Sequence, residues 1–353
     1  MHLINVPLIN SFLLGASIFL SYAIALAVEQ EPLVVVRAEA LNFIPGTSVQ
    51  PDSPLVRSSV GEKLTWLLAV WDKTHGGIMH LETSGPLDNP INTQKTVRRQ
   101  HEFFTSGRYG LDGILWIVNT YDAGDGTLAF VHVEHAEHTG TPGQIGKSRI
   151  GLAWRPRDAE KFHYLGHVIS PFGDPDPHNI QGAPYLIRGG YFLVYFHDST
   201  GLAVARAPVA EVLEAARHGH TSDWWKYASS EAGFSSAGLG GKSKRLNVDG
   251  ISHGDAACST VSDKCYLLLT RMNWKGEDTW IRLFETQDGV SFRLVRTIVQ
   301  QPATSVRKGY QFASIVNEDG TDNAVVGRRF YIYAYKDHQE RTRTMLRWTV
   351  EIE

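Results

Sequence analysis

Short hydrophobic runs led by an aromatic residue recur along the chain at nearly regular intervals. Five such runs begin at Trp66, Phe130, Phe192, Tyr266 and Tyr331, so that their starts lie 64, 62, 74 and 65 residues apart. Each run is rich in β-branched and aromatic residues and follows a turn signal, which is the pattern of a β-strand. The spacing therefore indicates a repeated β unit.

Each run is flanked by further segments with the character of strands. Partner strands are predicted before the runs, at residues 53–60, 113–121, 182–187, 255–261 and 311–316. Third strands are predicted after them, at residues 78–85, 149–155, 202–207, 281–289 and 345–352, and fourth strands at 162–169 and 292–299. A small sheet of this kind cannot bury both faces alone, so the units must stack around an axis. We therefore predict an all-β fold, a five-bladed β-propeller.

Other segments depart from the repeat or complete it. The β-branched run at residues 33–37 is predicted to close the ring as an outer strand beside the C-terminal run. Residues 208–217 carry hydrophobic residues at helical spacing and begin with Pro, which predicts one short helical insertion in blade three. A Gly/Ser-rich loop is expected at 229–241. Trp224 and Trp225 in this insertion form either a sugar-stacking platform or an aromatic plug between blades.

The first 27 residues contain no Asp, Glu, Lys or Arg. An apolar stretch at 12–26 ends in Ala25-Leu26-Ala27, which fits the small-x-small rule for signal-peptide cleavage. We therefore predict a signal peptide at 1–27 and a single propeller domain at 28–353. The alternative is an uncleaved membrane anchor, although the stretch is short for a full span. The mature protein is expected to be secreted or periplasmic, monomeric and free of the membrane.

The two cysteines fit an exported protein. Cys258 and Cys265 flank a polar turn between two β-prone runs, and this spacing can place the sulfur atoms opposite each other in a hairpin. A disulfide is favoured in an oxidising compartment, and two free buried thiols are the alternative.

The charge balance argues against nucleic acid as a partner. The chain has 34 Lys and Arg against 37 Asp and Glu, for a formal net charge of −3. Its basic run Lys242-Ser243-Lys244-Arg245 is short, so the footprint of a nucleic-acid binder is missing.

The inner strands of a propeller begin at the axis, so polar residues at their starts converge on one funnel. The residues at these predicted starts are Asp52, Asp112, Gln181, Asp255 with His253, and Tyr310 with Gln311. Clustered carboxylates raise one another's pKa, and one acid can then stay protonated while another is ionised, as glycoside hydrolysis requires. The alternative is that these Asp residues bind backbone N–H groups at strand entries.

A second polar cluster ends the middle strand of blade two. It contains His132, Glu134, His135, Glu137 and His138. The spacing does not match a zincin motif, so no metal site is predicted there. Strand alternation instead points His132 and Glu134 away from the neighbouring valines, toward the funnel or, alternatively, into an exposed hairpin tip.

These patterns give a set of candidate site residues. Asp52, Glu134 and Asp255 are the candidate catalytic residues. The candidate substrate-binding residues are His101, Glu102, Asp112, His135, His178, Gln181 and His253.

The chain resembles the five-bladed β-propeller glycosidases of the arabinanase/xylosidase type. The resemblance rests on Asp52-Ser-Pro54, on residues 180–186 and 190–195 in blade three, and on short motifs near the ends of third strands. It implies that Asp52 is the general base and that Asp112 tunes pKa and orientation. The family's acid is a Glu in a Glu-Gly-Pro-like motif, where this chain has Gln181. The acid role would then move to Glu134 or Asp255, unless the sugar differs or the fold serves only binding.

We therefore expect a secreted glycosidase acting on a polysaccharide or oligosaccharide, including one that contains furanosides. A non-catalytic carbohydrate-binding propeller and a polysaccharide lyase are the alternatives. No cofactor is expected to be required, and a structural cation in the central channel is left open.

Overall fold

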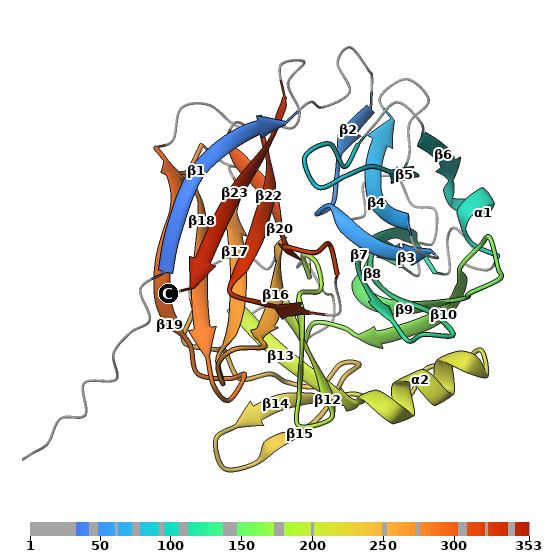
Figure 1. The fold of residues 1–353 in the computed structure, drawn as a ribbon. Coiled ribbons are helices and arrows are strands. Elements are labelled where there is room, and N and C mark those ends of the chain that lie inside the picture. Colours follow the sequence, from blue (N-terminus) through green and yellow to red (C-terminus); the bar gives the residue numbers. More distant parts are fainter. Residues whose placement is uncertain are drawn as a thin grey trace, which may run out of the picture. The chain divides into compact units, whose positions relative to one another are not determined.

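The described part of the chain, in this computed structural model, consists of five antiparallel sheets that follow one another along the sequence (Figure 1). The described residues are 33–41, 49–60, 63–72, 78–91, 95–105, 112–136, 147–172, 180–198, 201–248, 253–272, 276–302, 309–321, 324–337 and 343–352. The sheets are the blades of a five-bladed β-propeller, as predicted from the repeats.

Blades one and two are formed by the N-terminal half of the chain. Blade one contains β2 (Val49–Pro51), β3 (Val56–Val60), β4 (Lys63–Asp72), β5 (Ile78–Ser84) and β6 (Lys95–Arg99), followed by α1 (Gln100–Phe103). Blade two contains β7 (Ile114–Asp122), β8 (Gly126–Ala136), β9 (Lys147–Pro156) and β10 (His163–Ile169). Their inner strands are β2 with β3, and β7.

The remaining blades follow in order. Blade three contains β11 (Tyr185–Arg188), β12 (Tyr191–Asp198), β13 (Gly201–Pro208), β14 (Trp225–Ser229) and β15 (Gly233–Ala237), with α2 (Val209–Arg217) after β13. Blade four contains β16 (His253–Ser259), β17 (Cys265–Arg271), β18 (Thr279–Thr286) and β19 (Arg293–Gln301), with β21 (Val325–Val326) added in parallel beside β16. Blade five contains β20 (Tyr310–Asn317), β22 (Arg329–Lys336), β23 (Thr344–Ile352) and β1 (Leu33–Leu41).

The N-terminal strand completes the last blade, as the sequence predicts. β1 pairs antiparallel with β23 in a register that places Leu33 opposite Ile352 and Leu41 opposite Met345 (Figure 1). Without β1, β23 would present a row of free backbone N–H and C=O groups at the edge of the sheet. The first and last described strands of the chain therefore share one sheet.

The inner strand of blade one is interrupted where one continuous strand was expected. Pro54 has no backbone N–H, so it cannot donate to the β4 ladder. Ser53 bridges the interruption, because its Oγ accepts a hydrogen bond from the Ala69 N–H at 2.9 Å. The Asp52 N–H donates to the Ala69 carbonyl at 2.9 Å. Asp52 therefore lies in a fixed break between β2 and β3.

Large apolar side chains fill the interfaces between blades. Tyr185 of blade three stacks on Phe130 of blade two with ring centroids 4.7 Å apart. Trp66 of blade one contacts Tyr333 of blade five at 6.0 Å. All four side chains are buried, so each interface gains apolar burial and specific ring geometry.

The insertion in blade three contains the predicted helix and also a strand where a loop was predicted. α2 begins after Pro208, and its apolar face packs on blade two through Val212 and Ala216 (Figure 1). The expected loop at 229–241 contains β15, which pairs with β14. Trp224 is buried in the core of blades two and three, as in the plug alternative.

The predicted disulfide is present. Cys258 and Cys265 lie directly opposite each other in β16 and β17 and are bonded through their sulfur atoms.

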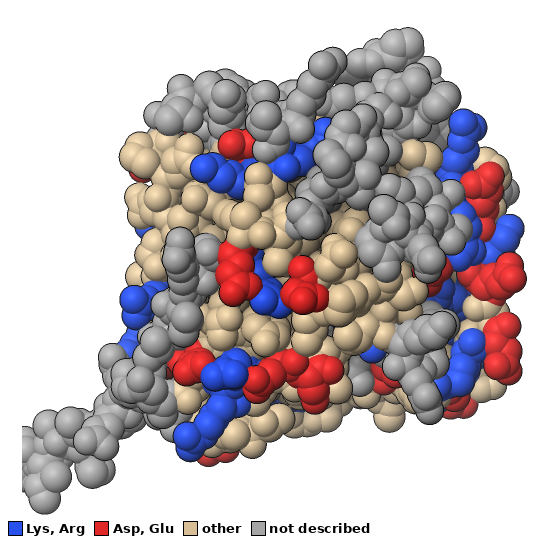
Figure 2. Space-filling view, turned by 45° about the horizontal axis from the view of Figure 1, so that its top comes forward, with Lys and Arg blue, Asp and Glu red and all other residues tan. Residues whose placement is uncertain are grey.

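No helix among the described residues is long and apolar enough to cross a membrane. The predicted signal peptide lies outside the described residues. Acidic and basic side chains are interspersed among the coloured residues of the face drawn in Figure 2.

Candidate active site

Polar and aromatic side chains from four blades contact one another near the starts of the inner strands. Asp52 of blade one bonds to Trp116 of blade two, and His132 of blade two contacts His253 of blade four with ring centroids 6.2 Å apart. His253 in turn contacts Phe312 of blade five at 5.2 Å. We call Asp52, Trp116, His132, Glu134, His253 and Phe312 the axial cluster.

The Asp52 carboxylate is the best-defined acid of the cluster. Its Oδ2 accepts a hydrogen bond from Trp116 Nε1 at 3.1 Å. Burial raises the pKa of Asp52 to about 6, and the negative charge of Glu134 adds to this effect, although the Trp116 hydrogen bond and His132 oppose it. Asp52 can therefore exchange a proton near neutral pH.

Glu134 lies at the end of β8 beside His132. The two side chains meet with His132 Nε2 3.3 Å from Glu134 Oε1. Val131 and Val133 are fully buried, and the regular pairing of β8 with β7 from Val131 to Glu134 places them on the face opposite His132 and Glu134. The His132 ring also lies 5.5 Å from the Trp116 ring. This arrangement holds Glu134 close enough to influence the charge of Asp52.

Asp255 is surrounded by hydrogen-bond donors. Its Oδ1 accepts from Asn119 Nδ2 and from the Ala256 N–H, both at 2.8 Å, and its Oδ2 accepts from the Ile315 N–H at 2.9 Å. Burial nevertheless raises the pKa of Asp255 to about 6, against the lowering effect of these three bonds. One carboxylate therefore joins the inner strands of blades two, four and five.

Two further hydrogen bonds, both at Thr120, link the inner strand of blade two to blades one and three. Thr120, next to Asn119 on β7, donates from Oγ1 to the Arg57 carbonyl of blade one. The Thr120 carbonyl accepts from Tyr185 Oη of blade three at 2.7 Å. Arg57 Nε also donates to the Gly320 carbonyl, which follows β20, at 2.7 Å. Neighbouring inner strands are thus held in register around the axis.

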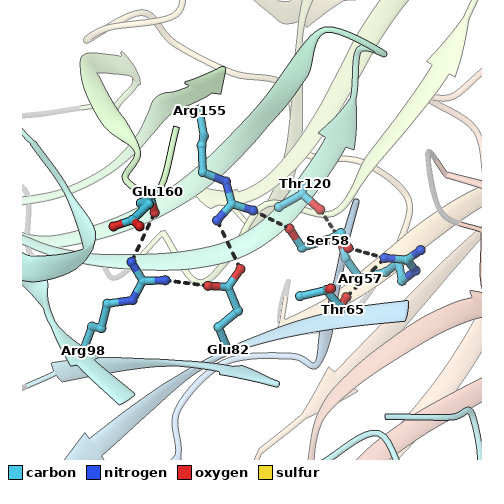
Figure 3. Close-up of polar contacts among 8 residues, drawn as sticks. All are labelled: Arg57, Ser58, Thr65, Glu82, Arg98, Thr120, Arg155 and Glu160. Atoms are coloured by element: carbon cyan, nitrogen blue, oxygen red, sulfur yellow. Dashed lines mark hydrogen bonds and ion pairs between the residues drawn. The ribbon is translucent and has the colours of Figure 1, made fainter. Parts of the chain in front are cut away.

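A half-buried ion-pair network links blade one to blade two (Figure 3). Glu82 on β5 accepts from Arg98 at 2.7 Å and from Arg155 of β9 at 3.1 Å. Arg155 also donates to Ser58 Oγ at 2.9 Å and lies over the Phe162 ring at 4.4 Å. Ser58 follows Arg57 on β3, so this network positions the strand that begins just after the Asp52 break.

Gln181 has a strained backbone close to β8, the strand that carries Glu134. Its φ is +61°, a left-handed conformation that is uncommon for a residue with a Cβ. The preceding Ile180 N–H donates to Ser148 Oγ at 3.1 Å, and Ser148 Oγ donates to the Val133 carbonyl at 3.1 Å. The half-buried Gln181 is thus anchored at the level of Glu134.

The other candidate residues fall in different places. His101 and Glu102 are exposed on α1, where Glu102 Oε2 accepts the Arg99 N–H at 2.7 Å and caps the helix. Asp112 precedes β7, and its carbonyl lies 3.3 Å from His167 Nε2. The side chain of His135 and the whole of His178 lie outside the described residues.

Among the described residues, no group of three or more His, Cys, Asp or Glu side chains is arranged to hold a metal ion.

A separate open hollow of about 650 Å³ lies beside α2. It contains none of the axial cluster, and its lining residues are Ala210, Glu211, Glu214, Ala215, His220, Thr221, Ser222 and Asp223.

Sequence reasoning missed Trp116, Asn119 and Phe312. Trp116 and Asn119 lie on the inner strand β7, but a register shift between Ile117 and Asn119 changes which side chains face the axis. Phe312 has a φ of +54° in a second irregular stretch. Their position on predicted inner strands was a usable signal, whereas the irregularities have no evident signal in the sequence.

No protein-family model matches the sequence, and no curated protein matches it. The fold, however, is shared with solved structures. The catalytic domain of a GH62 alpha-L-arabinofuranosidase from Coprinopsis cinerea is 6% identical, with a TM-score of 0.54 over 91% of this chain and 97% of that one. A family 117 glycoside hydrolase from the marine bacterium Zobellia galactanivorans is 10% identical, with a TM-score of 0.51 over 91% of each chain. A GH62 hydrolase in complex with xylotriose is 7% identical, with a TM-score of 0.50 over 91% of this chain and 98% of that one.

At these identities the likeness shows the fold alone. It confirms, at that level, the resemblance to five-bladed propeller glycosidases predicted from the sequence.

Proposed function

We propose that the protein is a secreted glycoside hydrolase that cleaves a polysaccharide or oligosaccharide by carboxylate acid–base catalysis. The observation that carries this proposal is the buried Asp52 carboxylate, whose pKa is raised to about 6 by burial and, further, by the charge of Glu134 near the end of β8. The fold shared with glycoside hydrolases supports it. The Cys258–Cys265 disulfide favours an oxidising compartment, in keeping with export.

Asp52 is assigned the base role. Ionised, it takes a proton from water as the water oxygen bonds to the anomeric carbon. Burial makes this carboxylate more basic than an exposed Asp, which suits proton abstraction near neutral pH. The Trp116 hydrogen bond fixes the carboxylate in one orientation.

Glu134 is assigned the acid role. In its protonated form it gives its proton to the glycosidic oxygen as the bond from that oxygen to the anomeric carbon breaks. His132, 3.3 Å away, orients the Glu134 carboxyl. The proton taken by Asp52 and the proton given by Glu134 balance over the hydrolysis, and exchange with solvent restores both groups.

Asp255 is assigned a positioning role in this proposal. Its carboxylate oxygens already accept three hydrogen bonds from Asn119, Ala256 and Ile315. A carboxylate engaged in this way is poorly placed to contact substrate. It instead fixes the strand that carries His253 against the strands that carry Trp116 and Phe312.

A carbohydrate-binding propeller without catalysis is the second candidate, and Gln181 favours it. A neutral amide at the position that the resemblance assigns to the acid can hydrogen-bond a sugar but cannot supply a proton.

The test is product analysis on a panel of plant and microbial polysaccharides with the full-length secreted protein. Asp52→Asn and Glu134→Gln are each expected to lower turnover by about 10²-fold or more while the melting temperature is retained. Asp223→Asn and Glu231→Gln are the matched controls, because both residues are exposed in blade three and lie outside the axial cluster. Absence of products from every polysaccharide, together with retained binding, would favour the second candidate.

A further inference from the structure

Three cations stand on the surface of blade three after β15. Lys242, Lys244 and Arg245 are exposed, whereas Ser243 and Leu246 are buried. We call Lys242, Lys244 and Arg245 the basic strip. The strip belongs to the basic run noted in the sequence, and the proposed catalytic chemistry does not use it.

The backbone of the strip is held on both sides. The Lys244 N–H donates to the Tyr227 carbonyl of β14 at 2.8 Å, and the Leu246 N–H donates to the Leu202 carbonyl of β13 at 2.8 Å. Arg245 lies against Gly201 at the start of β13, because a Cβ on Gly201 would fall 2.9 Å from Arg245 Nε. The three cations are therefore presented from a fixed backbone.

A buried ion pair lies beneath the basic strip and does not neutralise the charge of the strip. Ser243 Oγ donates to Asp198 Oδ2 at 2.7 Å, but Asp198 is already paired with Lys226, whose Nζ lies 3.6 Å from the same oxygen. Asp198 and Lys226 neutralise each other below the surface. Lys242 and Lys244 form no ion pair within the part of the chain that the structure describes. Among the described residues of this surface, Lys242 and Lys244 therefore carry positive charge that Asp198 does not neutralise.

An exposed aromatic ring lies next to the strip. Phe172 is 44% exposed, and its N–H donates to Asp198 Oδ1 at 3.1 Å. Lys242 Nζ lies 6.0 Å from the centre of the Phe172 ring. A ring beside a cation offers a stacking face for a sugar and a charge for an acidic substituent.

Hydrogen bonds connect this surface to the axial cluster. His197, the neighbour of Asp198, donates its N–H to the Ile180 carbonyl at 2.9 Å. Ile180 precedes Gln181 and is anchored through Ser148 to the end of β8. The basic strip and Glu134 therefore lie toward the same ends of neighbouring blades.

We propose that the basic strip and Phe172 bind an anionic segment of the polysaccharide, with sugars that carry carboxylate or sulfate groups. This inference rests on the proposed function, because the bound segment would belong to the chain that is cleaved at the axial cluster. Phe172 stacks on a sugar ring while Lys242 and Lys244 pair with its acidic groups. The strip thus selects charged over neutral polysaccharides.

Binding is measured with wild-type protein by affinity electrophoresis and calorimetry. The probes are polygalacturonate, which carries carboxylates, dextran sulfate, which carries sulfates, and linear arabinan, which is neutral. We expect binding to an anionic probe that weakens by about fivefold or more between about 50 and about 500 mM NaCl, because salt screens exposed charges. The probe that binds more tightly identifies the acidic group.

Lys242→Glu and Lys244→Glu are expected to weaken that binding by about tenfold each, because charge reversal replaces attraction with repulsion. Lys161→Glu, an exposed cation on another blade, is the matched control and is expected to leave it unchanged. Equal loss in all three variants, or absence of binding to both anionic probes, would overturn the proposal. If the protein binds an anionic probe but hydrolyses no polysaccharide, the proposed hydrolase function is overturned and the proposed anion-binding role of the basic strip is retained. Hydrolysis of arabinan alone would support the proposed hydrolase and overturn the proposed role of the basic strip.

Discussion

Replacing Asp255 with Asn separates two contributions to stability, the ionisation of the buried carboxylate and the hydrogen bonds that it accepts. An amide at this position keeps one oxygen for Asn119 Nδ2 and the Ala256 N–H, but turns an NH₂ group toward the Ile315 N–H. Leaving that backbone donor unsatisfied costs about 1–3 kcal/mol at any pH. The variant also has no carboxylate to ionise inside the fold.

Ionisation of the Asp255 carboxylate destabilises the wild-type fold, so its removal in the variant changes the free energy of unfolding in the opposite direction. The pKa of Asp255 rises from 3.8 to about 6 on folding, and one pKa unit corresponds to about 1.4 kcal/mol. A folded pKa above the unfolded value gives stability that is present below pH 3.8 and lost as the pH rises through about 6. Allowing for the partial exposure of the residue, wild type should lose about 1–3 kcal/mol over this range that the variant does not lose.

We therefore expect Asp255→Asn to be destabilising at about pH 4.5 and close to neutral or stabilising at about pH 8. Urea unfolding followed by tryptophan fluorescence at these two pH values measures the difference. Asp288→Asn is the control, because burial raises the pKa of Asp288 but is outweighed by its hydrogen bonds with Ser291, Val290 and Thr286 together, so that the pKa is lowered. The loss in that variant should be constant over the same range.

A loss in Asp255→Asn that stays constant or grows with pH would refute the reasoning. Turnover gives a second readout, because a positioning residue should retain most of its activity where the protein is folded. If Asp255→Asn loses as much turnover as Asp52→Asn while melting normally, Asp255 transfers a proton and its assignment here is wrong.

Four further outcomes follow from contacts described above. On a cleaved polysaccharide, kcat/KM should rise with pH through about 6 as Asp52 ionises, and a profile that is flat between pH 5 and 7 would contradict its base role. Deleting the chain through the end of β1 should lower the melting temperature, since β23 then becomes an open edge; an unchanged value in a thermal melt would argue against the pairing. Glu82→Gln should lower the free energy of unfolding in urea by about 1–3 kcal/mol, because it leaves the buried Arg155 and the partly exposed Arg98 without their shared carboxylate, and an unchanged value would show the network to be dispensable. The intact mass of the secreted chain should match a start near Val28 and a Cys258–Cys265 bridge, whereas a mass that includes the first 27 residues would refute cleavage.

The sequence predicted the architecture well because the blades are local. Each is a meander of neighbouring strands, and the aromatic-led runs mark its second strand in every repeat. The helix at 208–217 was also predicted from its hydrophobic spacing, and the closing strand at 33–37 from its β-branched run. The break between β2 and β3 was missed, although Pro54 was a visible signal for it.

The candidate site could be predicted only in part. Alternation on β8 was enough to place Glu134 beside His132. The donors around Asp255 could not be foreseen, because they depend on register irregularities in β7 and β20. An irregularity of one residue exchanges the faces of a strand, and this decides whether Asn119 or its neighbour faces Asp255.

The closure of blade five by β1 also sets an order of events during synthesis. β1 is made before every other described strand, and its partner β23 is made last, so the fifth blade cannot form until both are present. Until then, β1 must be kept from pairing with other exposed strand edges, and contacts this distant in sequence close slowly. The ring is therefore closed late, and β23 keeps an unpaired edge until β1 joins it.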